Sequence, residues 1–232
     1  MEASRLFLNS AIKEKICQYL SFENAIQFRD ALGLSSLKCP ITILDPKNQQ
    51  EIILPGVNQT TIKAYKLIRQ NGLNSAFRTA AETGQNSVVQ TLLTVKDIDV
   101  NASNQYGNTA LMLAVFNGHD SVVQTLLTVK AINVNETSRF GQTALMLASE
   151  NGYNLIVQIL IAAGANVNAA SQSGQTALMD ASYKGRDSVV KTLIAAGVNV
   201  GAVNQYGMTA LMLASRKGHD SVVQILKAAG AV

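Results

Sequence analysis

The pattern Gly-Xaa-Thr-Ala-Leu-Met occurs four times in this chain at a nearly constant spacing. The copies begin at Gly107, Gly141, Gly174 and Gly207, so their intervals are 34, 33 and 33 residues. A second set of glycines keeps the same period, at positions 84, 118, 152, 185 and 218. A period of this length indicates stacked supersecondary units, none of which buries its apolar face alone. This repetition favours a binding protein over an enzyme.

The unit at 107–140 shows how one period is expected to fold. Thr109 stands directly before a short apolar run at 110–116, and its hydroxyl can accept hydrogen bonds from the first turn of a helix. Gly118 follows this run, and glycine adopts the left-handed conformation at which helices often end. We therefore expect a helix over 110–116 that Thr109 caps and Gly118 terminates.

A second helix is expected after this turn. Asp120 or Ser121 can cap it. The apolar residues of 122–128 recur at i, i+1, i+4 and i+5, which places them on one helical face. Residues 132–135 have extended propensity and lead to the next loop glycine. Each period is therefore expected to form a helix, a tight turn, a second helix and an extended loop.

This unit resembles the ankyrin repeat, whose pattern includes Gly-Xaa-Thr-Pro-Leu-His, a glycine turn, Val-Xaa-Xaa-Leu-Leu and Gly-Ala-Xaa-Val-Asn. Residues 141–170 match it best. The resemblance implies a mostly α-helical ankyrin-repeat solenoid over 73–232, after a small helical region at 1–72. Its five units are 73–106, 107–140, 141–173, 174–206 and 207–232.

Several positions depart from the family pattern. Alanine replaces its proline at 110, 144, 177 and 210, and methionine replaces its histidine at 112, 146, 179 and 212. We expect these methionines to fill the core. The first two units lack a glycine after the second helix, so we expect the chain to pass from this helix into the loop by a different path there. Lys227 stands where earlier units carry Leu or Ile, and we expect the array to end near Val232.

The resemblance implies that a partner protein binds a concave face formed by loop tips and helix ends. Tyr, Phe and Arg, which often anchor interfaces, are frequent at these positions. Aromatic rings beside turn glycines can instead shield a neighbouring loop, and recent duplication would also repeat them. The predicted protein-binding residues are Tyr106, Asn108, Phe116, Asn117, Arg139, Phe140, Gln142, Glu150, Gln175, Tyr183, Lys184, Tyr206, Met208, Arg216 and Lys217.

Charged residues add two hypotheses about this face. Lys184, Arg216 and Lys217 indicate an acidic ligand toward the C-terminus, and charge reversal should then weaken binding. Asp180 replaces a leucine of the other units, and we expect a solvated ion pair with Lys184 at i+4 rather than a catalytic acid. The resemblance implies that histidines 119 and 219 tie adjacent turns, so no metal site, cofactor or catalytic set is expected.

Composition restricts the remaining classes. The formal net charge is +4, without a run of like charges, which argues against nucleic acid as a partner. Cys17 and Cys39 lack ligand spacing, so reduced thiols are expected. No leader pattern and no apolar stretch of membrane-spanning length occurs. We therefore expect a monomeric cytoplasmic protein that does not bind membranes.

Residues 8–34 resemble an F-box, a short motif that docks on a Skp1-like protein of a ubiquitin ligase. Its apolar positions would be Ile12, Ile16, Tyr19, Leu20, Phe28 and Leu32, although Leu8-Asn9 replaces the motif's Leu-Pro. The alternative is a helical hairpin that packs on the first repeat. As an adaptor, the chain would hold a substrate with its repeats, and in a chain from a pathogen this would occur in the host cytosol.

Residues 40–55 are expected to form a β-hairpin. The apolar segments 41–44 and 51–54 flank Asp45-Pro46-Lys47-Asn48, whose residue types favour a turn. A helix over 61–70 is expected to follow, capped by Thr60 or Thr61. No function is assigned to residues 35–72.

Overall fold

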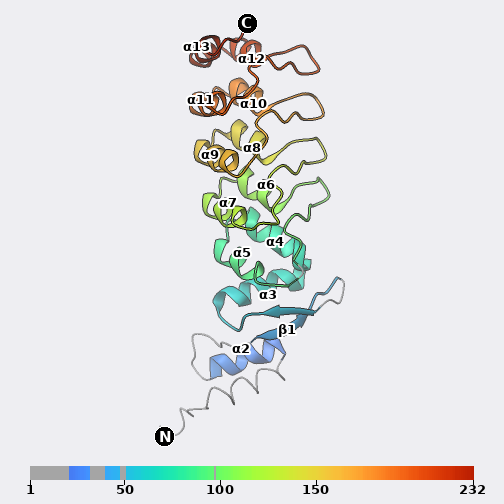
Figure 1. The fold of residues 1–232 in the computed structure, drawn as a ribbon. Coiled ribbons are helices and arrows are strands. Elements are labelled where there is room, and N and C mark those ends of the chain that lie inside the picture. Colours follow the sequence, from blue (N-terminus) through green and yellow to red (C-terminus); the bar gives the residue numbers. More distant parts are fainter. Residues whose placement is uncertain (1–20, 32–39, 48–50, 97) are drawn as a thin grey trace. The chain divides into compact units, whose positions relative to one another are not determined.

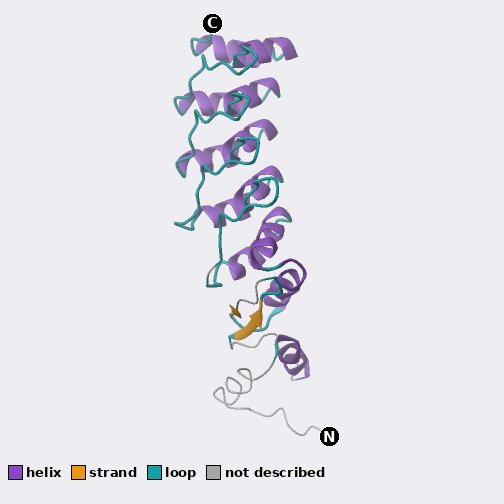
Figure 2. Cartoon of the chain, turned by 90° about the vertical axis from the view of Figure 1, so that its right-hand side faces the viewer, coloured by secondary structure: helices purple, strands orange, loops and turns teal. Residues whose placement is uncertain are grey.

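The computed structural model describes residues 21–31, 40–47, 51–96 and 98–232, but not the side chains of Phe28 and Ala31 (Figure 2). These residues form two compact units. One consists of the described part of Met1–Ala80 together with Gln85–Val100, and the other of Ala81–Gly84 and Asn101–Val232. Neither Cys17 nor Cys39 lies in the described ranges.

The first unit contains the predicted hairpin. Strand β1 (Ile41–Leu44) pairs antiparallel with β2 (Glu51–Leu54), and Ile41 lies opposite Leu54. Alternate side chains of both strands are buried, as expected for a hairpin that covers a core with one face. Helix α2 (Phe22–Ala31) contributes Phe22, whose ring stacks on Tyr65 at a centroid distance of 4.2 Å. Thus the prediction of strands at 41–44 and 51–54 is confirmed.

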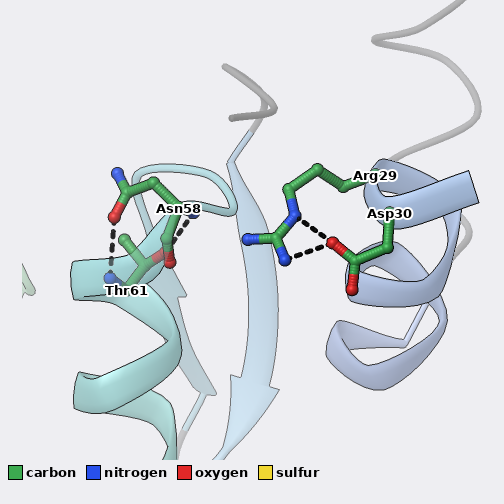
Figure 3. Close-up of polar contacts among 4 residues, drawn as sticks. All are labelled: Arg29, Asp30, Asn58 and Thr61. Atoms are coloured by element: carbon green, nitrogen blue, oxygen red, sulfur yellow. Dashed lines mark hydrogen bonds and ion pairs between the residues drawn. The ribbon is translucent and has the colours of Figure 1, made fainter. Parts of the chain in front are cut away.

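Helix α3 (Gln59–Asn71) begins earlier than the sequence predicted. Its N-cap is Asn58, whose Oδ1 accepts hydrogen bonds from the N–H groups of Thr60 and Thr61 at 2.8 and 2.9 Å. Thr61 Oγ1 in turn accepts from the Asn58 N–H at 2.8 Å (Figure 3). The prediction that Thr60 or Thr61 caps this helix was therefore wrong, because asparagine takes the cap and Thr61 completes a capping box from inside the helix.

Asp45 in the hairpin turn also contacts the start of the helix that follows α3. Asp45 is buried, and its Oδ2 accepts a hydrogen bond at 2.9 Å from the backbone N–H of Leu73, where helix α4 (Leu73–Glu82) begins. A carboxylate is favourable beside the free N–H groups of a helix start. Helix α5 (Asn86–Leu92) follows α4. In the later units the inner helix begins at the residue equivalent to Ala76, so α4 begins three residues earlier than they do.

Four helix pairs make up most of the second unit. Inner helices α6 (Ala110–Phe116), α8 (Ala144–Asn151), α10 (Ala177–Tyr183) and α12 (Ala210–Lys217) form one layer. Outer helices α7 (Asp120–Leu127), α9 (Asn154–Ala162), α11 (Asp187–Ala195) and α13 (Asp220–Ala228) form the other. The long loops project beyond the inner layer (Figure 1). This arrangement confirms the predicted solenoid of helix-turn-helix-loop units.

The inner helices start as predicted. In each, a threonine Oγ1 accepts a hydrogen bond from the backbone N–H of the methionine three residues later, for example Thr143 from Met146 at 3.3 Å. Met112, Met146 and Met179 are at most 1% exposed, which confirms their role in the core. Met212 of α12 is 46% exposed, since no later helix pair covers it in the described chain.

The outer helices start differently from the prediction. Their N-cap residues are His119, Tyr153, Arg186 and His219, and none of these accepts a capping hydrogen bond through its side chain. Asp120 is instead the first residue inside α7, so its assignment as a cap was wrong. A carboxylate in the first turn still favours the helix because it faces the positive end of the helix dipole.

Two ladders of hydrogen bonds join successive units. Asn135 accepts from the Asn166 N–H at 2.8 Å and donates to the Gly164 carbonyl at 3.2 Å, and Asn168 accepts from Asn199 in the same way. Gly201 occupies the corresponding position in the next unit, so this ladder stops there. At the loop tips, backbone N–H groups donate to the preceding loop: Arg139 to Tyr106, Gln172 to Phe140 and Gln205 to Ser173.

The loop glycines make the second ladder possible. Gly141 has a φ of 75°, and a Cβ added there would lie 2.8 Å from the backbone nitrogen of Gln172 in the next loop. Gly207 has a similar φ of 72°, but a Cβ added to it would meet no atom within 4 Å. Thus both glycines adopt the left-handed conformation, but only at Gly141 would a side chain also clash with the next loop.

This difference yields a matched prediction. We expect Gly207→Ala to lower the free energy of unfolding by about 1 kcal/mol, the usual cost of a left-handed alanine. Gly141→Ala should lower it by roughly 3 kcal/mol, because the added methyl group also pushes two loops apart. Urea unfolding of both variants measures the difference. Equal losses would show that the close approach of the loops contributes nothing.

Candidate protein-binding groove

Polar side chains hold each loop tip in shape. Asn204 Oδ1 accepts hydrogen bonds from the backbone N–H groups of Tyr206 at 2.9 Å and Met208 at 3.0 Å, so it spans the loop glycine between them. Equivalent residues are Asn104, Ser138 and Ser171. Reasoning from the sequence missed these four residues, although a polar residue recurs three positions before every loop glycine. They position the neighbouring predicted site residues.

Aromatic rings project from these loops and from the helix ends. Tyr106, Phe140 and Tyr206 at the loop tips are 55, 66 and 73% exposed. Phe116 and Tyr183, which end α6 and α10, are 56 and 37% exposed. A ring that shielded its neighbouring loop would lose more of its surface, so shielding alone does not explain these loop-tip aromatics.

The predicted residues fall into two rows along the inner layer. The helix-end row carries most of the charge, and the loop-tip row is mainly polar and aromatic. The helix-end row contains Phe116, Asn117, Glu150, Tyr183, Lys184, Arg216 and Lys217. The loop-tip row contains Tyr106, Asn108, Arg139, Phe140, Gln142, Gln175, Tyr206 and Met208.

Asn117 and Gln175 make hydrogen bonds within the protein. Asn117 Nδ2 donates to the carbonyl of Leu113 at 2.9 Å and thus satisfies the end of its own helix. Gln175 Oε1 accepts from Asn204 Nδ2 at 2.7 Å and links two successive loops. These contacts give both residues a structural role, and a partner would have to compete with them.

The helix-end row is joined across units by charged contacts. Lys184 Nζ lies 3.3 Å from Glu150 Oε1 on the neighbouring helix. Lys217 Nζ lies 4.4 Å from the centroid of the Tyr183 ring, and a hydrogen bond from Lys217 lowers the pKa of the Tyr183 hydroxyl. Arg216 and Lys217 are exposed, and among the described residues no carboxylate lies within 4.0 Å of either cation.

The two histidines tie adjacent turns, as the sequence predicted. His119 Nε2 lies 2.9 Å from the carbonyl oxygen of Glu82, and His219 Nε2 lies 3.1 Å from that of Tyr183. Arg186 does the same in its unit, because its Nε donates to the Glu150 carbonyl at 3.2 Å. Arg186 therefore contributes to stacking between units.

The predicted ion pair between Asp180 and Lys184 was wrong. Lys184 pairs with Glu150 instead, and the contact of the Asp180 carboxylate is a long hydrogen bond of 3.4 Å from Gln175 Nε2. Burial, with a smaller effect of the Glu150 charge, raises the pKa of Asp180 to about 7. Asp180 lines a cavity of about 290 Å³ together with Phe140, Gln142, Met146, Ser171, Ser173 and Gln175.

Comparison with known families identifies the repeated unit. A family model described as "Ankyrin repeats (3 copies)" matches residues 51–138, 77–171, 127–204 and 145–232. The chain belongs to the ankyrin-repeat family. Ankyrin repeats generally mediate protein–protein interactions, and proteins built from them are typically binding scaffolds rather than enzymes. No curated protein matches the chain.

The F-box-like segment lies mostly outside the described residues. This applies to Ile12, Ile16, Tyr19, Leu20 and Leu32, and to the side chain of Phe28. Within the described part of this ankyrin-repeat protein, Phe22 and Ala25 of α2 are buried in the first unit. The family matches begin at residue 51, so the F-box resemblance stays a prediction.

Metal-binding clusters and membrane-spanning helices are both absent from the described residues. Among them, no group of three or more His, Cys, Asp or Glu side chains is arranged to hold a metal ion. None of the described helices has the length and apolar character needed to cross a lipid bilayer.

Asp180 should make stability depend on pH. Its pKa is about 7 in the folded protein and 3.8 when unperturbed, so between these values the folded state holds a proton that the unfolded state has lost. The contribution of Asp180 to the free energy of unfolding therefore falls as the pH rises from 3.8 to about 7. We expect Asp180→Leu, which restores the residue of the other units, to add about 2 kcal/mol at pH 8 and much less at pH 5.

Urea unfolding of both proteins at the two pH values measures this effect, and Asp180→Asn serves as an isosteric control. An equal gain at pH 5 and pH 8 would contradict a raised pKa for Asp180.

Proposed function

We propose that this ankyrin-repeat protein is a non-catalytic scaffold that binds a partner protein in the groove between its loop-tip and helix-end rows. Among the aromatic side chains that the structure describes, the exposed ones are Tyr106, Phe116, Phe140, Tyr183 and Tyr206. All five lie on these two rows, whereas Phe22, Tyr65 and Phe77 are at most 7% exposed and Tyr153, before the outer helix α9, is half-buried. This segregation is the observation that carries the proposal, since exposed aromatic side chains mark interaction surfaces.

The rigidity of the loops supports the same function. Each ring at a loop tip stands on a backbone held by a side-chain oxygen and by hydrogen bonds to the adjacent loop. An interface that is ordered before binding loses less conformational entropy when the partner docks. The scaffold is proposed to act as a monomer in the cytoplasm, with neither nucleic acid nor membrane as its partner.

Among the residues that the structure describes, unpaired positive charge is concentrated at one end of the proposed groove. Arg216 and Lys217 are exposed cations at the end of α12, while Lys184 is already paired with Glu150. An acidic stretch of the partner would therefore pair with the α12 end of the groove. The attraction should weaken as salt rises, because both cations are open to solvent.

A display selection with random peptides tests the groove directly. We expect Tyr106→Ala, Phe140→Ala and Tyr206→Ala together to weaken selected peptides at least about tenfold, because truncating an anchor ring often costs more than 1 kcal/mol. Arg216→Glu with Lys217→Glu should weaken acidic peptides by a similar factor. Fluorescence anisotropy measures both changes.

Matched controls come from the outer helices and from the segment that follows α7. Leu155→Ala removes another apolar side chain that is 51% exposed, and Lys130→Glu with Lys191→Glu reverses two other exposed cations. These controls should leave the affinity unchanged. Peptides that bind the aromatic variant and the wild-type protein equally well would overturn the proposal.

The adaptor function also stays a prediction, supported by the F-box resemblance of residues 8–34. If it is correct, the full chain should co-elute from a sizing column with a Skp1-type protein. A chain that lacks residues 1–34 should elute separately from it. Absence of a complex with the folded full chain would leave the scaffold function alone.

A further inference from the structure

One cavity of the groove combines a carboxylate with an aromatic rim. It lies between two successive loops and the inner helices α8 and α10. Phe140, which is 66% exposed, borders it, buried Met146 lies at its apolar side, and Asp180 supplies the charge. Gln142 and two serines add polar atoms.

The carboxylate in this cavity lacks a cationic partner. Lys184 is the nearest candidate in the sequence, but its Nζ pairs with Glu150. Among the residues described, no Lys, Arg or His nitrogen lies within 4.0 Å of the Asp180 oxygens. The donor to Asp180 is the neutral amide of Gln175, at 3.4 Å. A partly buried carboxylate with one weak donor is costly in the free protein.

The other units show that the fold does not need this charge. Leucine stands at the equivalent positions 113, 147 and 213, and Leu147 and Leu213 are 9 and 7% exposed. Asp180 therefore sits in a position that accepts an apolar side chain, and the hydrogen bond that its carboxylate accepts from Gln175 stays within its own repeat. A ligand that supplies a cation would offset the cost of burying the carboxylate.

We propose that this cavity receives a cationic side chain, by preference arginine, from the polypeptide bound in the groove. A guanidinium group can donate two parallel hydrogen bonds to the Asp180 carboxylate and lie against the face of Phe140. The cavity volume of about 290 Å³ lies just below the range of about 300–1,000 Å³ for small-molecule sites. A cavity of this size has room for one inserted side chain.

This inference rests on the proposed function and makes it more specific. The partner would carry a basic residue opposite Asp180 and acidic residues opposite Arg216 and Lys217. Because these sites lie on different units of one stack, the two charges would set the direction in which the polypeptide lies along the groove. Such complementarity contributes to specificity and association rate.

Proton release provides an additional signature. Glu150 from α8 and Lys184, the C-cap residue of α10, are the charged groups that act on Asp180, and Gln175 donates to it from the loop. In the free protein the pKa of Asp180 is raised to about 7, and an inserted guanidinium would lower it. Binding should then release protons near neutral pH and weaken as the pH falls toward 5.5.

The first experiment uses N-acetyl-arginine methylamide as a probe and ¹³C-methyl methionine NMR as the readout. We expect the Met146 methyl signal to shift in a saturable manner, while the signal of the buried Met112 stays unchanged. The neutral citrulline analogue should produce no shift. Loss of the shift in Asp180→Asn would support the proposal, whereas an equal response to both analogues, or no response to arginine, would overturn it.

A double-mutant cycle with a groove-bound peptide gives an independent test. Replacing the peptide's arginine by citrulline should weaken binding about tenfold to the wild-type protein and little to Asp180→Leu. Additive effects of the two changes would overturn the cavity proposal. The groove proposal would still stand if Tyr106→Ala with Tyr206→Ala, two residues outside the cavity, weakened peptide binding, so the two proposals fail separately.

Discussion

The second unit depends on contact between successive repeats at a fixed spacing. Each helix pair has an apolar face that only its neighbour can cover, and the loops at Arg139, Gln172 and Gln205 each donate a backbone hydrogen bond to the loop before them. Gly107, Gly141 and Gly174 allow this approach because a Cβ at each of them would collide with the backbone of the next loop. A constant repeat length therefore keeps helices and loops in register at the same time.

The rows of the proposed groove follow from this register. Because the inner helices end at equivalent positions, residues one period apart become neighbours, as the contacts of Glu150 with Lys184 and of Tyr183 with Lys217 show. The stacking contacts occupy the backbone and the buried side chains, which leaves the loop tips free to vary. Aromatic residues at the loop tips and charged residues at the helix ends are therefore placed on the surface without a cost to the core.

Asp180 is the exception in an otherwise apolar column. It loses solvation, its nearest cation is engaged by Glu150, and its pKa rises accordingly. The desolvated Asp180 carboxylate thus destabilises the fold at one position of one repeat, beside the exposed ring of Phe140. Groups that are strained or unpaired in this way are frequent at binding sites, because a ligand that pairs with them relieves the penalty.

Local rules explain what the sequence alone determined. The threonine caps and the strands at 41–44 and 51–54 follow from interactions within a few residues, and the period is visible directly as a repeated pattern. Only the tertiary structure decided that Asp45 caps a helix 28 residues away and that Lys184 selects Glu150 over Asp180. It also decided which residues line the Asp180 cavity. These choices depend on distances between side chains of different repeats or elements, and such distances exist only after the chain has packed.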